Sequence, residues 1–176
     1  MRAVVIYESM YGNTHLIAEA IGRGLGHENE VVVVPVAEAG PELLDGAGLV
    51  VTGGPTHVHG MSGARSRQAA VEAAHKDGSE LTLDADAEGP GLRDWFDAVG
   101  RVQGWGAAFD TRLDGPAMLT GRASKAIAKL LERHGLTEVA PAQSFLVTKD
   151  NRLHPGEEDR AEQWGRALAA KLVPAI

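Results

Sequence analysis

The feature that most constrains the fold lies near the start of the chain, where an apolar run, a short polar turn and an amphipathic stretch follow one another. Residues 3–7 (AVVIY) predict a buried strand, and the apolar residues from Leu16 to Leu25 recur at the 3.6-residue spacing of a helix. The turn between them, Ser9–Thr14, is rich in hydroxyl groups. Such a turn offers an anion both free N–H groups and the positive end of the helix dipole. The sequence therefore predicts a phosphate site at this turn.

Further apolar runs follow, and helical patterns separate them. We expect strands at residues 31–36, 49–52, 106–109 and 144–147. We expect helices at residues 41–44, 91–99, 123–134 and 156–172. The runs are nearly continuous rather than alternating, which is typical of strands that are covered on both faces of a parallel sheet. The alternation of strands and helices predicts an α/β three-layer sandwich with right-handed crossovers.

Composition narrows the class of protein. A chain of 176 residues predicts one domain with a single large core. Its net charge of −7 argues against nucleic acid or an anionic membrane surface as a main partner. The absence of cysteine excludes disulfides, thiolate metal sites and cysteine nucleophiles. The N-terminal apolar run is too short for a signal peptide or a membrane span, and we expect a cytoplasmic protein.

One segment does not fit the simple alternation of strands and helices. Residues 62–74 are rich in alanine and predict an extra helix, and residues 77–91 read as an acidic loop that contains Gly and Pro. We therefore expect an insertion at about residues 63–90. It could cover the ligand pocket or serve a partner, and the sequence leaves this open.

Three segments are expected to meet at one edge of the sheet, because ligands of open parallel sheets bind beyond the carboxyl ends of the strands. They are Ser9–Thr14, Gly53–Ser62 and Asp110–Thr120. By contrast, the glycine-rich run of residues 22–26 lies where the first helix is expected to end, so we interpret it as a stop signal rather than a nucleotide loop.

The pattern Ser9-x-x-Gly12-Asn13-Thr14 after a first strand resembles the FMN-phosphate loop of flavodoxin-like proteins. The variant Ser-Met-Tyr-Gly-Asn-Thr is similar to the loop of flavodoxin-domain proteins and of the related FMN-dependent quinone reductases. The run Gly53-Gly54-Pro55-Thr56 is also similar to the family. The resemblance covers nearly the whole chain. It implies a single flavodoxin-like domain over residues 1–176, with a five-stranded parallel sheet in the order 2-1-3-4-5 and FMN as the cofactor.

The resemblance also implies roles for individual residues. The hydroxyl groups of Ser9 and Thr14 would donate to the FMN phosphate, and the N–H groups of Tyr11, Gly12 and Asn13 would complete the cradle. Asn13 would also tie the loop to its neighbours or cap the helix. The second and third segments would hold the isoalloxazine ring. The expected FMN-binding residues are Ser9, Met10, Tyr11, Gly12, Asn13, Thr14, Pro55, Thr56, His57, Val58, His59, Gly60, Asp110, Thr111 and Arg112.

The two ring-binding segments depart from the family pattern, because neither contains Trp or Tyr. His57 and His59 are the flat side chains of the first of them, and Arg112 is the cation of the second. Positive charge near the ring would favour the anionic reduced flavin. We expect no metal, since His57-x-His59 lacks a nearby third ligand. We expect Trp105 and Trp164 in the core.

The leading hypothesis is an FMN-binding redox protein that mediates electron transfer to a partner protein or a small acceptor. A first alternative is an NAD(P)H-dependent quinone or flavin reductase, which would be an FMN-dependent oxidoreductase. A second alternative is a flavin-free domain that keeps the fold for binding. In the first two cases the cofactor supplies the chemistry, so no side chain is expected to act as acid, base or nucleophile. The oligomeric state is left open.

Overall fold

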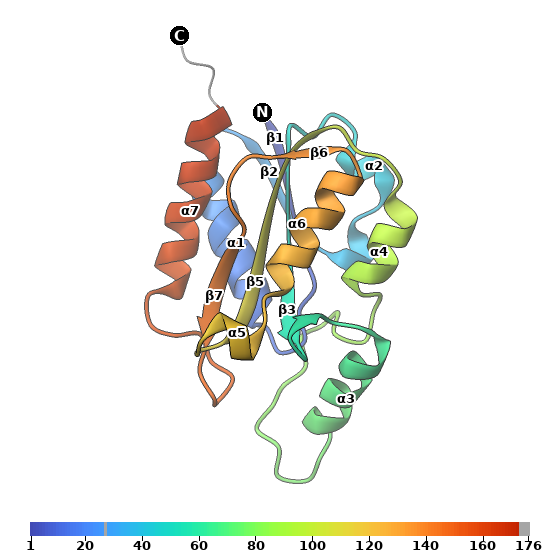
Figure 1. Cartoon of the computed structure of the whole chain (residues 1–176), viewed down its shortest axis with the longest axis vertical. Helices are drawn as coiled ribbons and strands as arrows, with labels where there is room; N and C mark the ends of the chain where they lie inside the picture. The colour runs from blue at the N-terminus through green and yellow to red at the C-terminus, as the bar shows by residue number, and fades with distance from the viewer. Residues whose placement is uncertain (27, 173–176) are drawn as a thin grey trace.

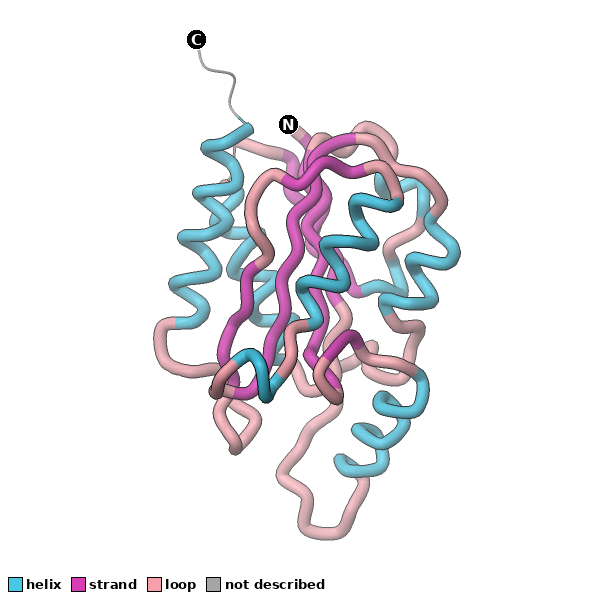
Figure 2. The backbone as a smooth tube through the Cα atoms, in the orientation of Figure 1, coloured by secondary structure: helices cyan, strands magenta, loops and turns pink. Residues whose placement is uncertain are grey.

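The computed structural model describes residues 1–26 and 28–172, and its centre is a parallel sheet with helices on both faces (Figures 1 and 2). The strands are β1 (Arg2–Tyr7), β2 (Glu30–Pro35), β3 (Leu49–His57), β5 (Gly104–Leu113), β6 (Leu136–Glu138) and β7 (Gln143–Val147). The strand order is β2-β1-β3-β5, and both β6 and β7 pair with β5, β6 near its start and β7 along its end. Since β5 and β7 are the fourth and fifth predicted strands, the predicted order 2-1-3-4-5 is confirmed, with β6 as an addition.

The helices that cover the sheet arise from runs with an apolar face. They are α1 (Asn13–Leu25), α2 (Pro41–Leu44), α4 (Leu92–Val99), α6 (Ala123–Arg133) and α7 (Glu157–Leu172), together with the short 3₁₀ turn η1 (Val36–Glu38). Alternate residues of each strand point to opposite faces. Val4 and Ile6 pack in the layer of α4 and α6, whereas Val5 and Tyr7 pack in the layer of α1 and α7. The apolar residues of the central strands β1, β3 and β5 are thus buried on both faces of the sheet, as the continuous apolar runs predict.

Helices α1 and α7 approach each other closely at two glycines. A Cβ atom on Gly24 would lie 2.0 Å from the carbonyl oxygen of Glu162, and one on Gly165 would lie 2.4 Å from that of Ile21. The predicted stop signal therefore explains only some of the glycines at residues 22–26. Helix α1 does end at Leu25, with Gly26 at a φ of 82°, but Gly24 is needed for the contact with α7.

Strands β3 and β5 run further than predicted. Each continues past the predicted end because its backbone stays paired, with Gly54 opposite Asp110 and Pro55 opposite Thr111. Strand β3 then turns back as a short hairpin with β4 (Gly60–Met61). Residues 53–57 and 110–112, which were expected in loops, therefore lie in strands at the carboxyl edge of the sheet.

The prediction that Trp105 lies in the core is wrong, since 44% of its surface is exposed. It stands near the start of β5, close to the edge where β6 is only three residues long. Trp164 is half-buried on α7 and packs edge-on against Phe145. Within the described residues, none of the helices combines the length and apolar character needed to cross a membrane.

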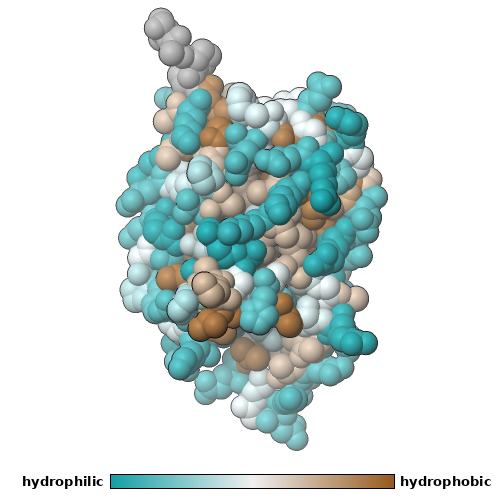
Figure 3. All heavy atoms as spheres, in the orientation of Figure 1, coloured by the Kyte–Doolittle hydropathy of each residue, from teal (hydrophilic) through white to brown (hydrophobic). Residues whose placement is uncertain are grey.

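The insertion forms helix α3 (Ala64–Ala74) and a long loop that together extend beyond the carboxyl end of the sheet (Figure 1). Short helix α5 (Ala117–Thr120) lies at the same end. The face in Figure 3 is largely hydrophilic, but apolar side chains gather over α5. The highly exposed apolar residues at this end are Val58, Leu113, Met118 and Leu119, which we call the apolar rim.

Candidate functional site

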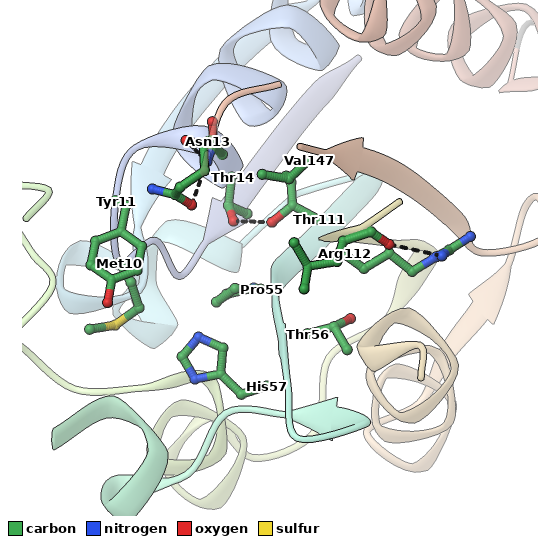
Figure 4. A pocket seen from close by; sticks show the side chains of 12 residues that line it. Met10, Tyr11, Asn13, Thr14, Pro55, Thr56, His57, Thr111, Arg112 and Val147 are labelled. Carbon is green, nitrogen blue, oxygen red and sulfur yellow. Dashed lines mark hydrogen bonds between the residues drawn. The ribbon is translucent and has the colours of Figure 1, made fainter. Parts of the chain in front are cut away.

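A pocket of about 190 Å³ opens at the carboxyl edge of the sheet, where the three predicted segments meet (Figure 4). Many of the expected residues line it, namely Met10, Tyr11, Asn13, Thr14, Pro55, Thr56, His57, Thr111 and Arg112. Leu113, Val147 and Asn151 complete the wall. None of these three is among the expected binding residues. Leu113 lies in the third predicted segment, whereas Val147 and Asn151 lie at the end of β7 and in the turn after it, which carries no recognisable motif.

The N-terminus of α1 opens into this pocket without a cap. The helix begins at Asn13, no side chain of residues 1–26 or 28–172 caps it, and its first turn contains no acidic residue. Gly12 precedes it at a φ of 91°, a conformation that favours glycine. Asn13 and Thr14 of the first turn both line the pocket. The unpaired N–H groups and the positive end of the helix dipole are therefore available to an anion there.

Side-chain contacts fix the shape of the loop before α1. Ser9 is buried, and its Oγ accepts the Gly12 N–H at 3.0 Å. The Thr14 hydroxyl is hydrogen-bonded to that of Thr111 at 2.7 Å. Asn13 Nδ2 donates to Asn151, to the carbonyl oxygen at 3.0 Å and to Oδ1 at 3.1 Å. Of its two expected roles, Asn13 thus ties the loop to a neighbour and does not cap the helix.

The remaining expected residues lie outside the pocket wall for identifiable reasons. Val58 and His59 form the tip of the β3–β4 hairpin at positive φ, and 86% of the Val58 surface is exposed. The residues outside the wall are Ser9, Gly12, Val58, His59, Gly60 and Asp110. Ser9 and Gly12 shape the loop before α1, residues 58–60 form the hairpin turn, and Asp110 caps a helix.

Asp110 and Thr56 cap helix α6 from the sheet. Asp110 is fully buried, and its Oδ2 accepts the Ser124 N–H at 2.7 Å. Thr56 Oγ1 accepts the Ala123 N–H at 3.0 Å. The residue before α6, Arg122, makes no such bond to the helix. Two strand side chains therefore satisfy N–H groups that a local cap would usually satisfy, and they hold α6 beside the pocket.

The guanidinium group of Arg112 is bound to the loop that carries α5. Its Nη1 donates to the Gly115 carbonyl at 2.8 Å and to Thr120 Oγ1 at 2.9 Å. Figure 4 shows the group directed away from His57. Its Nε is buried and has no hydrogen-bond partner among the described residues. The charge of Arg112 is thus held at the rim of the pocket, with one donor unused.

His57 adds little positive charge to the pocket at pH 7. Burial lowers the pKa of His57 below its usual 6.5; nearby Glu8 acts in the opposite direction, and Arg67 adds to the lowering. The ring is therefore predominantly neutral at pH 7. Burial also raises the pKa of Tyr11 above 10.0, so its hydroxyl stays protonated. The flat side chains of the pocket are both uncharged.

These residues fit the phosphate of a flavin nucleotide. An uncapped helix N-terminus and the neutral hydroxyl of Thr14 beside it are donors suited to a doubly charged oxyanion. In the described part of the chain, no group of three or more His, Cys, Asp or Glu is placed to hold a metal ion.

Comparison with known proteins identifies the family of the chain. The family model described as Flavodoxin matches residues 5–94, a stretch that includes the loop before α1 and the β3–β4 hairpin. A search of curated proteins finds no significant sequence match.

Among solved structures, a flavodoxin from the domain Archaea has a TM-score of 0.65 and 21% identity, with 97% of this chain and 98% of that chain covered. Oxidised flavodoxin 1 from Bacillus cereus has a TM-score of 0.62 and 18% identity, with coverage of 98% and 99%. A flavodoxin, WrbA-like protein from Agrobacterium tumefaciens has a TM-score of 0.54 and 21% identity, with coverage of 96% and 95%. At these identities the structures establish the fold, while the family model matches more than half of the sequence. The chain therefore belongs to the flavodoxin family.

Proposed function

We propose that this protein binds FMN in the pocket at the carboxyl edge of the sheet and acts in electron transfer. The observation that carries the proposal is the uncapped N-terminus of α1, which opens into the pocket beside Thr14 and Asn13. In this proposal the FMN phosphate accepts hydrogen bonds from the first-turn N–H groups and from Thr14. The bound FMN would supply the redox chemistry, and the protein would bind and orient it.

The size of the pocket favours a cofactor that is only partly enclosed. Its volume of about 190 Å³ is below the roughly 300–1,000 Å³ of sites that enclose a whole ligand. One edge of the flavin would therefore stay accessible to an electron acceptor. The apolar rim lies at the same end of the molecule, and Leu113 belongs to both the rim and the pocket wall. It offers an apolar contact to a partner protein or a small acceptor. We expect this electron transfer to take place in the cytoplasm.

A reductase that uses NADH or NADPH is a second candidate, and one observation favours it. The pocket would enclose only part of a flavin, and its Tyr11 and His57 rings are uncharged, which favours stacking of a second flat group on the exposed side of the flavin. In this case an NAD(P)H nicotinamide would donate a hydride to the flavin, and a quinone or free flavin would then accept the two electrons.

The proposal is tested by titrating the purified apoprotein with FMN and following the quenching of flavin fluorescence. We expect saturable one-to-one binding, and the absence of quenching at a large excess of FMN would contradict the proposal. The FMN-loaded protein is then mixed with NADH or NADPH and a quinone. Steady-state turnover identifies a reductase, whereas reduction only by a strong chemical reductant identifies a carrier.

A further inference from the structure

Helix α3 of the insertion is held to the molecule in an unusual way. It has 11 residues, none of which is fully buried, so apolar packing does not explain its position. It nevertheless lies beyond the carboxyl end of β3 (Figure 1), the edge of the sheet at which the pocket opens. Polar contacts must therefore hold it there.

The anchor of α3 is a buried ion pair that involves the residue before the predicted phosphate loop. Glu8 follows β1 directly, and only 5% of its surface is exposed. Arg67 of α3 lies 3.7 Å from its Oε1. Glu8 also accepts the Ser62 hydroxyl and the Leu92 N–H, the latter at 2.8 Å. Arg67 also lies 3.6 Å from Asp94 Oδ2 and donates through Nη2 to the Gly89 carbonyl. Because a buried guanidinium and a buried carboxylate are both costly without an opposite charge nearby, the Arg67–Glu8 pair favours this position of α3 beside β1.

Two residues on the same face of the docked helix reach the two flat side chains of the pocket. Ser66 Oγ is hydrogen-bonded to His57 Nδ1 at 3.2 Å, and the carbonyl of Ala70, one turn later, accepts the Tyr11 hydroxyl at 2.8 Å. The loop after α3 adds a third contact, since the Asp84 N–H donates to the Met10 carbonyl at 2.8 Å. Tyr11 and His57 come from different segments of the chain, but both are hydrogen-bonded to α3.

We propose that the insertion is a positioning element, in which the Arg67–Glu8 pair docks α3 so that Ser66 and Ala70 hold the His57 and Tyr11 rings in the wall of the pocket. The identification of the ligand as FMN rests on the proposed function, but the positioning role does not. Both rings can rotate about their side-chain bonds, and α3 removes that freedom before the ligand arrives. Preorganisation of this kind strengthens binding because less ordering is needed when the complex forms.

The first test observes the apoprotein by NMR, without any cofactor. We would titrate His57 in the wild type and in the Ser66→Ala and Arg67→Met variants. Ser66→Ala releases the ring towards water, and we expect the pKa of His57 to rise towards the ordinary value. In Arg67→Met the loss of a nearby cation also raises this pKa, so Ser66→Ala decides this test. Arg65→Met is the matched control, because it removes a cation of the same helix whose side chain is exposed and leaves the anchor intact. It should leave the His57 titration unchanged.

The second test measures the dissociation constant of FMN for the same proteins and for Tyr11→Phe, which keeps the ring but loses its hydroxyl. We expect affinity to fall about 3- to 10-fold in Ser66→Ala and Tyr11→Phe, and further in Arg67→Met, with Arg65→Met matching the wild type. If Arg67→Met does not fold, the other two variants decide the outcome.

An unchanged His57 titration together with unchanged FMN affinity in Ser66→Ala and Tyr11→Phe would overturn the positioning role. If the wild type fails to bind FMN, the proposed function fails, and the His57 titration of the apoprotein still decides whether α3 holds the ring.

Discussion

Thr14 is the side chain whose removal tests the phosphate site at the scale of one residue. It lines the pocket in the first turn of α1, and its hydroxyl is buried against that of Thr111. We expect Thr14→Ala to weaken FMN binding by about 1–3 kcal/mol, because hydrogen-bonded partners lose their donor. This corresponds to roughly 5- to 150-fold in the dissociation constant. Thr137→Ala, at an exposed position of β6, is the matched control. The dissociation constants are measured by fluorescence titration. A Thr14→Ala protein that binds FMN as tightly as the wild type would mean that the phosphate binds elsewhere.

His57 links the pocket to the stability of the apoprotein. Its pKa is lower in the folded protein than the usual 6.5, so below pH 6.5 the unfolded chain binds a proton that the folded protein does not. This contribution to stability is present above pH 6.5 and is lost as the pH falls from there to the folded-state pKa. We expect His57→Gln to reduce the loss of stability on acidification. His75→Gln, on an exposed residue, should not. Urea unfolding at about pH 7.5 and pH 5 measures both, and equal pH dependence in His57→Gln and the wild type would refute the effect.

At the residue scale, the residues that line the pocket could be predicted from the sequence more accurately than the contacts that their side chains make. The spacing of the motif identified Tyr11, Asn13 and Thr14, since it depends on local chain geometry. Asp110 was expected near the flavin ring and instead caps α6. Arg112 lines the pocket, but its guanidinium group holds the α5 loop. These roles depend on which element packs beside each strand, and no local pattern encodes that.

At the scale of elements, the contact between α1 and α7 depends on two glycines. Replacing Gly165 by Ala would place a Cβ atom 2.4 Å from the backbone oxygen of Ile21. Alanine has a higher helix propensity than glycine by about 1 kcal/mol, which favours the variant. A clash with backbone is not relieved by a side-chain rotation, so we expect a net destabilisation of about 1–3 kcal/mol. Gln163→Ala, on the exposed side of α7, should be nearly neutral. Denaturant unfolding decides this, and a Gly165→Ala protein as stable as the wild type would contradict the close packing.

The elements themselves were predicted well where the apolar pattern was strong. The core strands and α4, α6 and α7 lie close to their predicted positions, because burial on both faces of the sheet leaves continuous apolar runs. The ends of β3 and β5 were placed too early, since Gly54, Pro55 and Asp110 are typical of loops but stay paired with neighbouring strands. The helix of the insertion was predicted, whereas its anchor to Glu8 joins residues far apart in the sequence.

At the scale of the whole molecule, ligand binding should stabilise the fold, because the proposed site is assembled from segments that meet only in the folded chain. FMN that binds the folded protein alone adds about 2.7 kcal/mol at 100 times its dissociation constant. We expect the midpoint of thermal unfolding to rise by roughly 5–11 °C under these conditions. Calorimetry with and without FMN measures the shift. The Thr14→Ala variant should show a smaller shift at the same FMN concentration, and an equal one would argue against the site.

The central claim is that the N-terminus of α1 binds the phosphate of a flavin nucleotide. It is tested most directly by comparing FMN with riboflavin, which has the same ring and lacks the phosphate, in fluorescence titrations of the apoprotein. We predict that FMN binds at least 100-fold more tightly than riboflavin, and that Thr14→Ala reduces the difference. Equal affinities for the two flavins, or binding of neither, would contradict the claim.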